Sequence, residues 1–370
     1  MKFILFFIFL TATCGGGKEV PDEPVPNYEI QCILNPAELN VSAKGNSYQI
    51  TITANRNWIV SSNQDWCVCK PLSGSAGSKY VEITVTSNID VERVATLTFI
   101  VDNLVKTVKV MQDAGEEPNY IPPGYSLIWQ DEFNEPRLSN GKPTLPKNSH
   151  WWFETGHGKD GWGNNEIQYY VSGFSGVDTC AQIYGGTLKI IAQKVGNQVF
   201  SIRMNSDESW KYGYFEARIK VPTGKGTWPA FWMLPKNFVT WPDDGEIDIM
   251  EAVGFAPNNV HCSIHCKAYN HINNTEKTAS KAVPTAQTDF HIYAVEWTED
   301  YIYGFVDGVR YFTFLNDKKG NKDTWPFNEP FYLKLNLAWG GNWGGAQGID
   351  ETALPATYEI DYVRVYQKEK

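Results

Sequence analysis

Short runs in which apolar and polar residues alternate fill most of the chain from residue 30 onward. Alternation with a period of two is typical of β-strands that bury one face. Turn-forming clusters such as Ser73–Gly77 separate the runs. About seven short strands within about 85 residues predict an immunoglobulin-like β-sandwich over residues 28–113. In this region the clearest runs are Tyr48–Ala54, Trp58–Val60, Tyr80–Val85, Ala95–Val101 and Thr107–Met111.

A second, longer set of alternating runs covers residues 125–368. Residues 114–124 lie between the two regions and contain three prolines, which predicts a stiffened linker. Neither region shows long runs with helical periodicity, so we predict an all-β chain with two domains. The predicted strands of the second domain include Gly185–Ala192, Tyr212–Val221, Phe290–Trp297, Tyr301–Val306, Phe331–Leu337 and Tyr358–Tyr366.

The first 27 residues predict export and anchoring. Residues 1–13 contain one lysine and an apolar run, Phe3–Leu10, that is too short for a permanent transmembrane helix, as in a signal peptide. Cys14 follows and precedes three glycines, similar to a bacterial lipobox. We expect Cys14 to be lipidated and residues 14–27 to form a flexible tether, giving a lipoprotein of the bacterial cell surface or outer membrane. A plain signal peptide with an incidental cysteine, and a periplasmic or secreted protein, are the alternatives.

Composition narrows the class of partner. The 370 residues include 14% aromatic side chains and carry a formal net charge of −10 at pH 7. Binding to a nucleic acid backbone needs clustered Lys and Arg, so this charge argues against nucleic acid. Exposed Trp and Tyr would suit the apolar faces of sugar rings, so a neutral carbohydrate fits better.

One predicted strand carries an acidic pattern, Glu246-Ile-Asp-Ile-Met-Glu251. Alternation places Glu246 and Asp248 on one face and the isoleucines on the other. It would also bury Glu251 beside the isoleucines, where an unpaired carboxylate is costly. A β-bulge at Ile249 and Met250 would return Glu251 to the face of the other two acids, and bulges are frequent beside active sites. The alternative is a set of three solvated charges on an exposed strand.

A neighbouring stretch places tryptophans on one face. The same alternation puts Trp228, Ala230 and Trp232 on one side of a strand, and Pro229, Phe231 and Met233 on the other. The tryptophans could be platforms for sugar rings or ordinary core residues.

Histidines and cysteines do not predict a metal centre. In His261-Cys-Ser-Ile-His-Cys266 the two histidines share one face and the two cysteines share the other, so four ligands cannot converge. Apart from Cys14, each domain contains three cysteines, which does not indicate a disulfide framework. Cys67 and Cys69 are too close along an extended strand to pair with each other, whereas Cys32 could pair with either. We expect most of these cysteines to be small buried apolar residues.

Seven motifs in order make the larger domain resemble the family 16 glycoside hydrolases. Within that family, the bulged spacing of the acids resembles the laminarinase branch. The first domain resembles a BACON-type module, on the basis of Trp58 through Trp66, the turn at 71–74, Asn88, Arg93 and the closing strand at 108–112. The seven motifs are Trp129–Phe133, Gly161–Glu166, Tyr212–Arg218, Gly226–Leu234, Gly245–Glu251, Phe290–Trp297 and Asp361–Tyr366.

The resemblance implies a concanavalin-like β-jelly-roll sandwich with an open cleft, and a retaining endo-β-glucanase acting on β-1,3 or mixed β-1,3/1,4-glucan. Glu246 would be the nucleophile, Glu251 the acid/base, and Asp248 the residue that hydrogen-bonds Glu246. Retention requires two carboxyl groups about 5–5.5 Å apart. The resemblance also implies a set of substrate-binding residues, with His265 near the acid/base or the substrate. That set is Asn164, Glu166, Arg203, Trp228, Trp232, Trp241 and His265, with Asn342 and Trp343 in a loop that could border the cleft.

We expect a monomer that requires no cofactor. Some relatives carry a structural calcium bound partly by an aspartate that matches Asp361. For the BACON-type module, the spacer role is favoured over glycan binding, because Trp58 and Trp66 lie in strands where core packing is common.

Three rival functions stay open. A hydrolase of a red-algal galactan, of the agarase or carrageenase type, would share the bulged motif, although few Lys or Arg lie near the motifs to bind sulfate. A non-catalytic glucan-binding protein would keep the fold, although here both glutamates are present. Transglycosylation would use the same covalent intermediate as hydrolysis.

Overall fold

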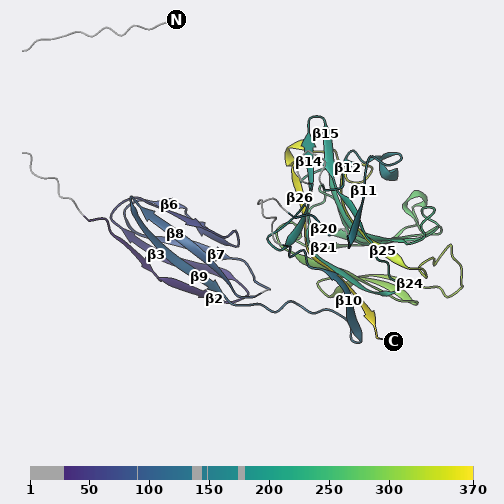
Figure 1. Cartoon of the computed structure of the whole chain (residues 1–370), viewed down its shortest axis with the longest axis horizontal. Coiled ribbons are helices and arrows are strands. Elements are labelled where there is room, and N and C mark those ends of the chain that lie inside the picture. The colour runs from purple at the N-terminus through teal and green to yellow at the C-terminus, as the bar shows by residue number, and fades with distance from the viewer. Residues whose placement is uncertain (1–28, 90, 136–143, 148, 174–179, 370) are drawn as a thin grey trace, which may run out of the picture. The chain divides into compact units, whose positions relative to one another are not determined.

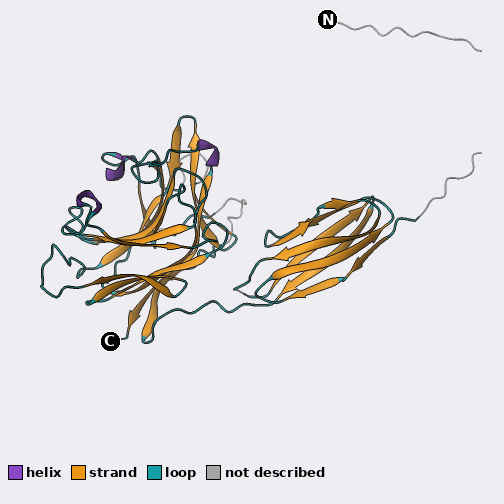
Figure 2. Cartoon of the chain, turned by 180° about the vertical axis from the view of Figure 1, so that it is seen from behind, coloured by secondary structure: helices purple, strands orange, loops and turns teal. Residues whose placement is uncertain are grey.

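The computed structural model describes residues 29–89, 91–135, 144–147, 149–173 and 180–369. The predicted signal peptide, Cys14 and the tether lie outside these residues. The chain divides into two compact units, residues 1–118 and 119–370, and the division falls within the predicted linker. Strands make up nearly all the regular structure of both units (Figure 2). None of the helices in the described residues is long and apolar enough to cross a membrane.

The N-terminal unit is a sandwich of two sheets (Figure 1). Its core is formed by alternate residues of each strand, as in β8, where Ala95, Leu97, Phe99 and Val101 are all buried. One sheet has the order β1 (Cys32–Asn35), β3 (Asn46–Ala54), β7 (Gly77–Val85) and β5 (Cys67–Lys70). The other has the order β2 (Glu38–Val41), β9 (Leu104–Gln112), β8 (Arg93–Val101), β4 (Trp58–Ser62) and β6 (Ser73–Gly74).

Both tryptophans of this unit pack against its core. Trp58 is fully buried there, and Gly74 leaves room for its ring, since a Cβ at Gly74 would lie 2.4 Å from that ring. Trp66 is partly buried against the same core, and Arg93 lies 4.3 Å from the centroid of its ring. The Trp58 ring is therefore not accessible for stacking on a sugar.

Among the described residues, Cys32, Cys67, Cys69, Cys262 and Cys266 are free thiols. Cys67 and Cys69 are buried, and the disulfide that the sequence left open between Cys32 and one of them is not formed. These thiols therefore act as apolar core residues, and burial raises the pKa of Cys69 to about 11.

The C-terminal unit is a larger sandwich whose two sheets contribute to one apolar core. The first sheet runs β12 (Tyr169–Tyr170), β15 (Gln198–Ser201), β14 (Thr187–Val195), β26 (Ala356–Lys368), β17 (Gly213–Lys220), β22 (His291–Trp297), β23 (Tyr301–Val306) and β24 (Val309–Leu315), with β10 (Tyr125–Asp131) paired to β26 and β13 (Ala181–Tyr184) to β14. The second runs β11 (Trp151–Glu154), β16 (Arg203–Ser206), β25 (Phe331–Trp339), β18 (Thr227–Pro235), β19 (Glu246–Ala252), β20 (Asn259–His265) and β21 (Lys277–Ala282).

Within the part of the chain that the structure describes, three short helical turns lie in the loops: η1 (Gly161–Asn165), η2 (His271–Asn273) and η3 (Glu351–Ala353). The prediction of an all-β chain with an immunoglobulin-like sandwich before a larger one is confirmed. In the N-terminal unit the predicted runs left out β1, β2 and β6, which have two to four residues each and are too short to show a period.

Candidate active site

The acidic pattern lies on β19, near the middle of the second sheet, and the predicted bulge is present. Against β18, Asp248 is opposite Trp232 and Met250 is opposite Phe231, so Ile249 is the extra residue. Ile249 and Met250 are both fully buried, while the side chains on either side, Asp248 and Glu251, return to the opposite face. The prediction that alternation with one bulge places Glu246, Asp248 and Glu251 on the same face is confirmed.

The residue immediately before β19 is a glycine, Gly245. Gly245 has φ of 94°, and a Cβ there would lie 2.9 Å from Pro326. A residue with a side chain would be strained at this φ and would also crowd Pro326. Gly245 therefore sets the position from which Glu246 begins.

The three carboxyl groups share a poorly solvated environment. Burial and the neighbouring Asp248 raise the pKa of Glu246 to about 8, and the same two causes raise the pKa of Glu251 to about 8. Burial raises the pKa of Asp248 to about 8 as well. Like charges this close cannot all ionise at neutral pH, so the group retains protons where isolated carboxyls would have lost them.

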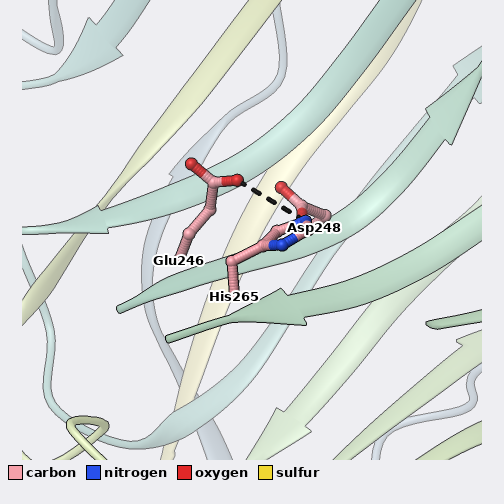
Figure 3. Close-up of side chains that lie close together, drawn as sticks. All are labelled: Glu246, Asp248 and His265. Carbon is pink, nitrogen blue, oxygen red and sulfur yellow. Dashed lines mark ion pairs between the residues drawn. The ribbon is translucent and has the colours of Figure 1, made fainter. Parts of the chain in front are cut away.

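His265 faces the first two acids (Figure 3). In the antiparallel register of β19 and β20, it lies opposite Glu246, while His261 lies opposite Glu251. Its Nε2 is 3.4 Å from Asp248 Oδ2 and 3.9 Å from Glu246 Oε1. The sequence had placed His265 near the acid/base or the substrate. The structure places it against Glu246 and Asp248, because the strands run in opposite directions.

Trp228 and Trp232 lie on the acidic face, as alternation predicted. Both are partly exposed, whereas Phe231 and Met233 are fully buried in the core. Trp228 Nε1 donates a 2.9 Å hydrogen bond to Glu251 Oε1, and Trp232 Nε1 donates a 2.7 Å hydrogen bond to Asn336 Oδ1. The reading of these tryptophans as ordinary core residues is therefore wrong, because their rings are held at the acidic face by polar contacts.

Beside Trp232 lies an ion network that the sequence did not predict. Arg203 Nε donates to Glu154 Oε2 at 2.6 Å, and Lys334 Nζ donates to the same oxygen at 2.7 Å. Both cations also lie over the Trp232 ring, at 4.9 and 5.0 Å from its centroid, while Trp162 lies over Arg203 at 4.6 Å. The predicted binding residue Arg203 is thus fixed between two indole rings.

The electrostatics of this network are strong because it is buried. Burial opposes ionisation of Glu154, but Arg203 and Lys334 outweigh it and lower the pKa of Glu154 to about 2. Burial, followed by the charge of Arg203, lowers the pKa of Lys334 to about 7. The site therefore contains a second group, besides the acids, whose proton affinity lies near neutrality.

Glu166 is held at the same face by hydrogen bonds. It accepts from Gln168 Nε2 at 2.6 Å and from Tyr170 OH at 3.1 Å. Asn336 Nδ2 in turn donates to Tyr170 OH at 3.2 Å, which joins Glu166 to Trp232 through two polar side chains. Burial raises the pKa of Glu166.

The predicted loop residues divide into two groups at the two ends of the face. Asn164 and Asn342 are linked by a backbone hydrogen bond of 2.7 Å, and the Trp343 ring meets that of Trp228 edge-on at 5.5 Å. At the other end, Trp241 lies against His265 at 5.8 Å and His271 at 4.9 Å.

The structure thus collects the predicted site residues of this domain on one face, with one exception. Asp361 lies on β26, in the other sheet, and its Oδ2 accepts from Arg218 Nη1 at 2.5 Å. A calcium ion held by Asp361 would have to share that carboxylate with a guanidinium, so the geometry does not favour it. The calcium stays a prediction.

Several site residues were missed, and one signal could have found Lys334 and Asn336. In β25, Tyr332, Lys334 and Asn336 alternate with the core residues Leu333 and Leu335, so their shared face was visible in the sequence. Glu154, Tyr170 and His271 carry no comparable pattern.

Comparison with known proteins agrees with this site. Residues 176–364 match the family described as glycosyl hydrolases family 16, and residues 56–113 match the BACON family of N-terminal domains. The chain is 44% identical over 258 residues to the beta-glucanase of Rhodothermus marinus, which covers 66% of this chain and 86% of that protein. It is 38% identical over 274 residues to glucan endo-1,3-beta-glucosidase A1 of Niallia circulans, but covers only 38% of that protein.

The fold agrees with solved relatives as well. The X-ray structure of the laminarinase from Rhodothermus marinus superposes with a TM-score of 0.61 at 43% sequence identity, covering 66% of this chain and 98% of that one. The fold of the larger unit is accordingly the β-jelly-roll of those enzymes. This chain belongs to glycosyl hydrolase family 16, with a BACON domain before its catalytic domain.

Proposed function

We propose that this protein is an endo-β-glucanase that hydrolyses internal β-1,3 links of laminarin, of mixed-linkage β-1,3/1,4-glucan, or of both. The observation that carries the proposal is the bulge of β19, which places Glu251 on the same face as Glu246 and Asp248. The similar proteins are a beta-glucanase, a glucan endo-1,3-beta-glucosidase and a laminarinase, and their names support the choice of substrate.

The chemistry we propose is a double displacement with retention of configuration. Glu246 attacks the anomeric carbon, and Glu251 protonates the departing glycosidic oxygen. A covalent glycosyl-enzyme forms, and Glu251 then takes a proton from the water that releases the sugar. The products are two shorter chains, and water supplies the hydroxyl group and the proton.

The proposed roles need Glu251 protonated and Glu246 ionised. Glu251 must hold a proton at working pH, and its burial near Asp248 favours the protonated form. Glu246 must be ionised to attack; burial and Asp248 raise its pKa, whereas His265 and, more weakly, Arg203 act to lower it. Asp248, between them, would share the remaining proton with Glu246 and keep a second charge away from Glu251.

Substrate binding would use the rest of the acidic face. Trp228 and Trp232 offer partly exposed rings for sugar stacking, and Arg203, Glu166 and Asn164 offer groups for sugar hydroxyls. Trp241 and Trp343 would extend the binding face in opposite directions from the acids.

Product analysis tests the proposal directly. Laminarin, barley-type mixed-linkage glucan, agarose and carrageenan are incubated side by side, and oligosaccharides are separated by size. We expect release of short β-glucan oligomers, with the β-anomer seen first by proton NMR. Cleavage of only the two galactans would overturn the substrate class, and an initial α-anomer would overturn retention. Lengthened rather than shortened oligosaccharides would indicate transglycosylation.

We also propose that the mature protein is a lipoprotein attached to the bacterial surface through Cys14, on the basis of the lipobox-like sequence. The native gene and a Cys14→Ser variant are expressed in a bacterial host, and the membrane and soluble fractions are compared. The wild-type chain should partition with the membrane fraction and the variant should not. Equal partitioning of both would contradict the anchor.

A further inference from the structure

Three side chains at the acidic face could together hold a metal ion. Glu246, Asp248 and His265 each present one ligand atom, and these atoms lie within 4.8 Å of one another. His265 Nε2 is 3.4 Å from Asp248 Oδ2, close to the separation of two ligands on one tetrahedral ion. Figure 3 shows the three side chains pointing toward a common point from β19 and β20.

A second observation is independent of this spacing. Asp248 is only 3% exposed, and within the described part of the chain its Oδ2 has no hydrogen-bond donor. This is the same oxygen that faces His265. A buried carboxylate oxygen normally has a partner, so an unpartnered one aimed into a group of ligands points to a ligand.

The donor set favours zinc over the common hard cations. One imidazole nitrogen and two carboxylate oxygens are a ligand set that suits Zn²⁺, whose fourth tetrahedral ligand can be water. Ca²⁺ needs six to eight oxygen ligands and Mg²⁺ retains most of its water, so a three-ligand site with one nitrogen serves them poorly.

We propose that Glu246, Asp248 and His265 bind one Zn²⁺ ion reversibly, and that bound zinc inhibits the enzyme by engaging Glu246. The binding stands on the geometry alone. The inhibition rests on the proposed function, because it requires Glu246 to be the nucleophile. The site shares His265 with the histidine and cysteine set considered in the sequence, but it does not include Cys262 or Cys266, which lie in the core.

Zinc binding is measured first, without any substrate. The full chain is titrated with Zn²⁺ by calorimetry and with Co²⁺ by visible absorption, which reports tetrahedral coordination. We expect one ion per chain, and in His265→Gln and Asp248→Asn binding weakened at least as much as the about 10–100-fold that loss of a ligand's hydrogen-bond partner causes. The absence of saturable binding, or an unchanged affinity in both variants, would overturn the proposal.

His291→Gln is the matched control. His291 Nδ1 lies 2.7 Å from Asp307 Oδ2 on the other sheet, so this variant also removes a histidine beside a carboxylate. Its zinc affinity should equal that of the wild type, and a loss equal to that of His265→Gln would overturn the assignment. Thermal melting of each variant shows whether a loss of zinc affinity is caused by unfolding.

Inhibition is then measured with laminarin. We expect Zn²⁺ to raise the apparent KM without lowering kcat, EDTA to restore activity, and Ca²⁺ and Mg²⁺ at equal concentration to have no effect. If glucans are hydrolysed but zinc does not bind, the zinc site fails and the proposed function stands. If zinc binds but no glucan is cleaved, the proposed function fails and the site stands.

Discussion

The two sandwiches of this chain use the same alternation but bury different kinds of polar residue. In the N-terminal unit, the buried polar side chains among the described residues are Asn88 and Gln112. Both donate to backbone carbonyls, including those of Asp113 and Thr86, and so close the ends of the sandwich. In the second sheet of the C-terminal unit, the buried polar groups include Asp248 and Lys334, which face other charges.

The difference shows what separates a scaffold from a site in a β-sandwich. Tryptophans occur in both units, so aromatic content does not distinguish them. Trp58 fills a core, whereas Trp232 lies on a face where cations and an amide hold its ring. Buried charges cost free energy, and the group of them that lies beside partly exposed tryptophans marks the functional face.

The largest effect is expected when the proposed catalytic carboxyl groups are removed. Glu246→Gln should lower kcat on laminarin by about 10⁴-fold or more, because the nucleophile is lost. Glu251→Gln should lower it by about 10²–10⁴-fold, since the general acid is lost. Steady-state release of reducing ends measures both. Activity of Glu246→Gln comparable to the wild type would remove the basis for the assignment.

The next test replaces one tryptophan of each unit by alanine. Trp58→Ala should destabilise the N-terminal unit by about 3–5 kcal/mol because it empties a packed core position. It should leave kcat/KM on soluble laminarin unchanged. Trp232→Ala should raise KM about tenfold, equivalent to about 1.4 kcal/mol of lost binding, and leave the N-terminal unit intact.

Denaturant unfolding, followed separately for the two units, together with laminarin kinetics, checks these two variants. A loss of activity in Trp58→Ala that matches the loss in Trp232→Ala would show that the contrast between the units is false.

A smaller effect is expected from the ion network. Lys334→Met should destabilise the C-terminal unit by about 1–3 kcal/mol, because Glu154 and Asn205 lose their buried donor. Lys236→Met, at an exposed lysine, serves as the control and should change stability by less than about 0.5 kcal/mol. Urea unfolding measures both, and equal stabilities would mean that Lys334 adds nothing to the fold.

The smallest expected effect is a pH-dependent gain in thermal stability in the variant Asp248→Asn. The folded pKa of Asp248, about 8, is above its ordinary value of 3.8, so the folded state keeps a proton that the unfolded chain releases between these values. The contribution of Asp248 to the free energy of unfolding therefore falls as pH rises through this window. Asp248→Asn removes that loss and should raise Tm near pH 7.5 by about 2–4 °C for each 1 kcal/mol removed, with little change near pH 4.

Calorimetric scans at the two pH values decide this prediction. A lower Tm for Asp248→Asn near pH 7.5, or the same difference from the wild type at both pH values, would contradict it.

Much of the site could be predicted because alternation is a local property. Glu246, Asp248, Trp228 and Trp232 share a face by counting along single strands, and one bulge accounts for Glu251. The family resemblance then supplied residues such as Arg203 whose position no local pattern indicates.

The rest depended on register between distant strands. Glu154 meets Arg203 because β11 pairs with β16, and Lys334 lies opposite Trp232 because β18 pairs with β25. These pairings join residues far apart in sequence. A lysine within a strand also predicts a solvated face, and only the ring of Trp232 and the neighbouring Glu154 explain why Lys334 is buried.

The bulge of β19 also changes how this strand would respond to a change in its length. A one-residue deletion in a regular strand moves every later side chain to the wrong face. Deleting Met250 here would instead restore plain alternation, leaving Glu246, Asp248 and Glu251 on one side and both isoleucines on the other. The acids would approach by about 3.3 Å along the strand, the rise of one residue. A single lost codon could therefore shorten the spacing of the acids while the sheet keeps its faces, leaving a gap in the core where Met250 had been.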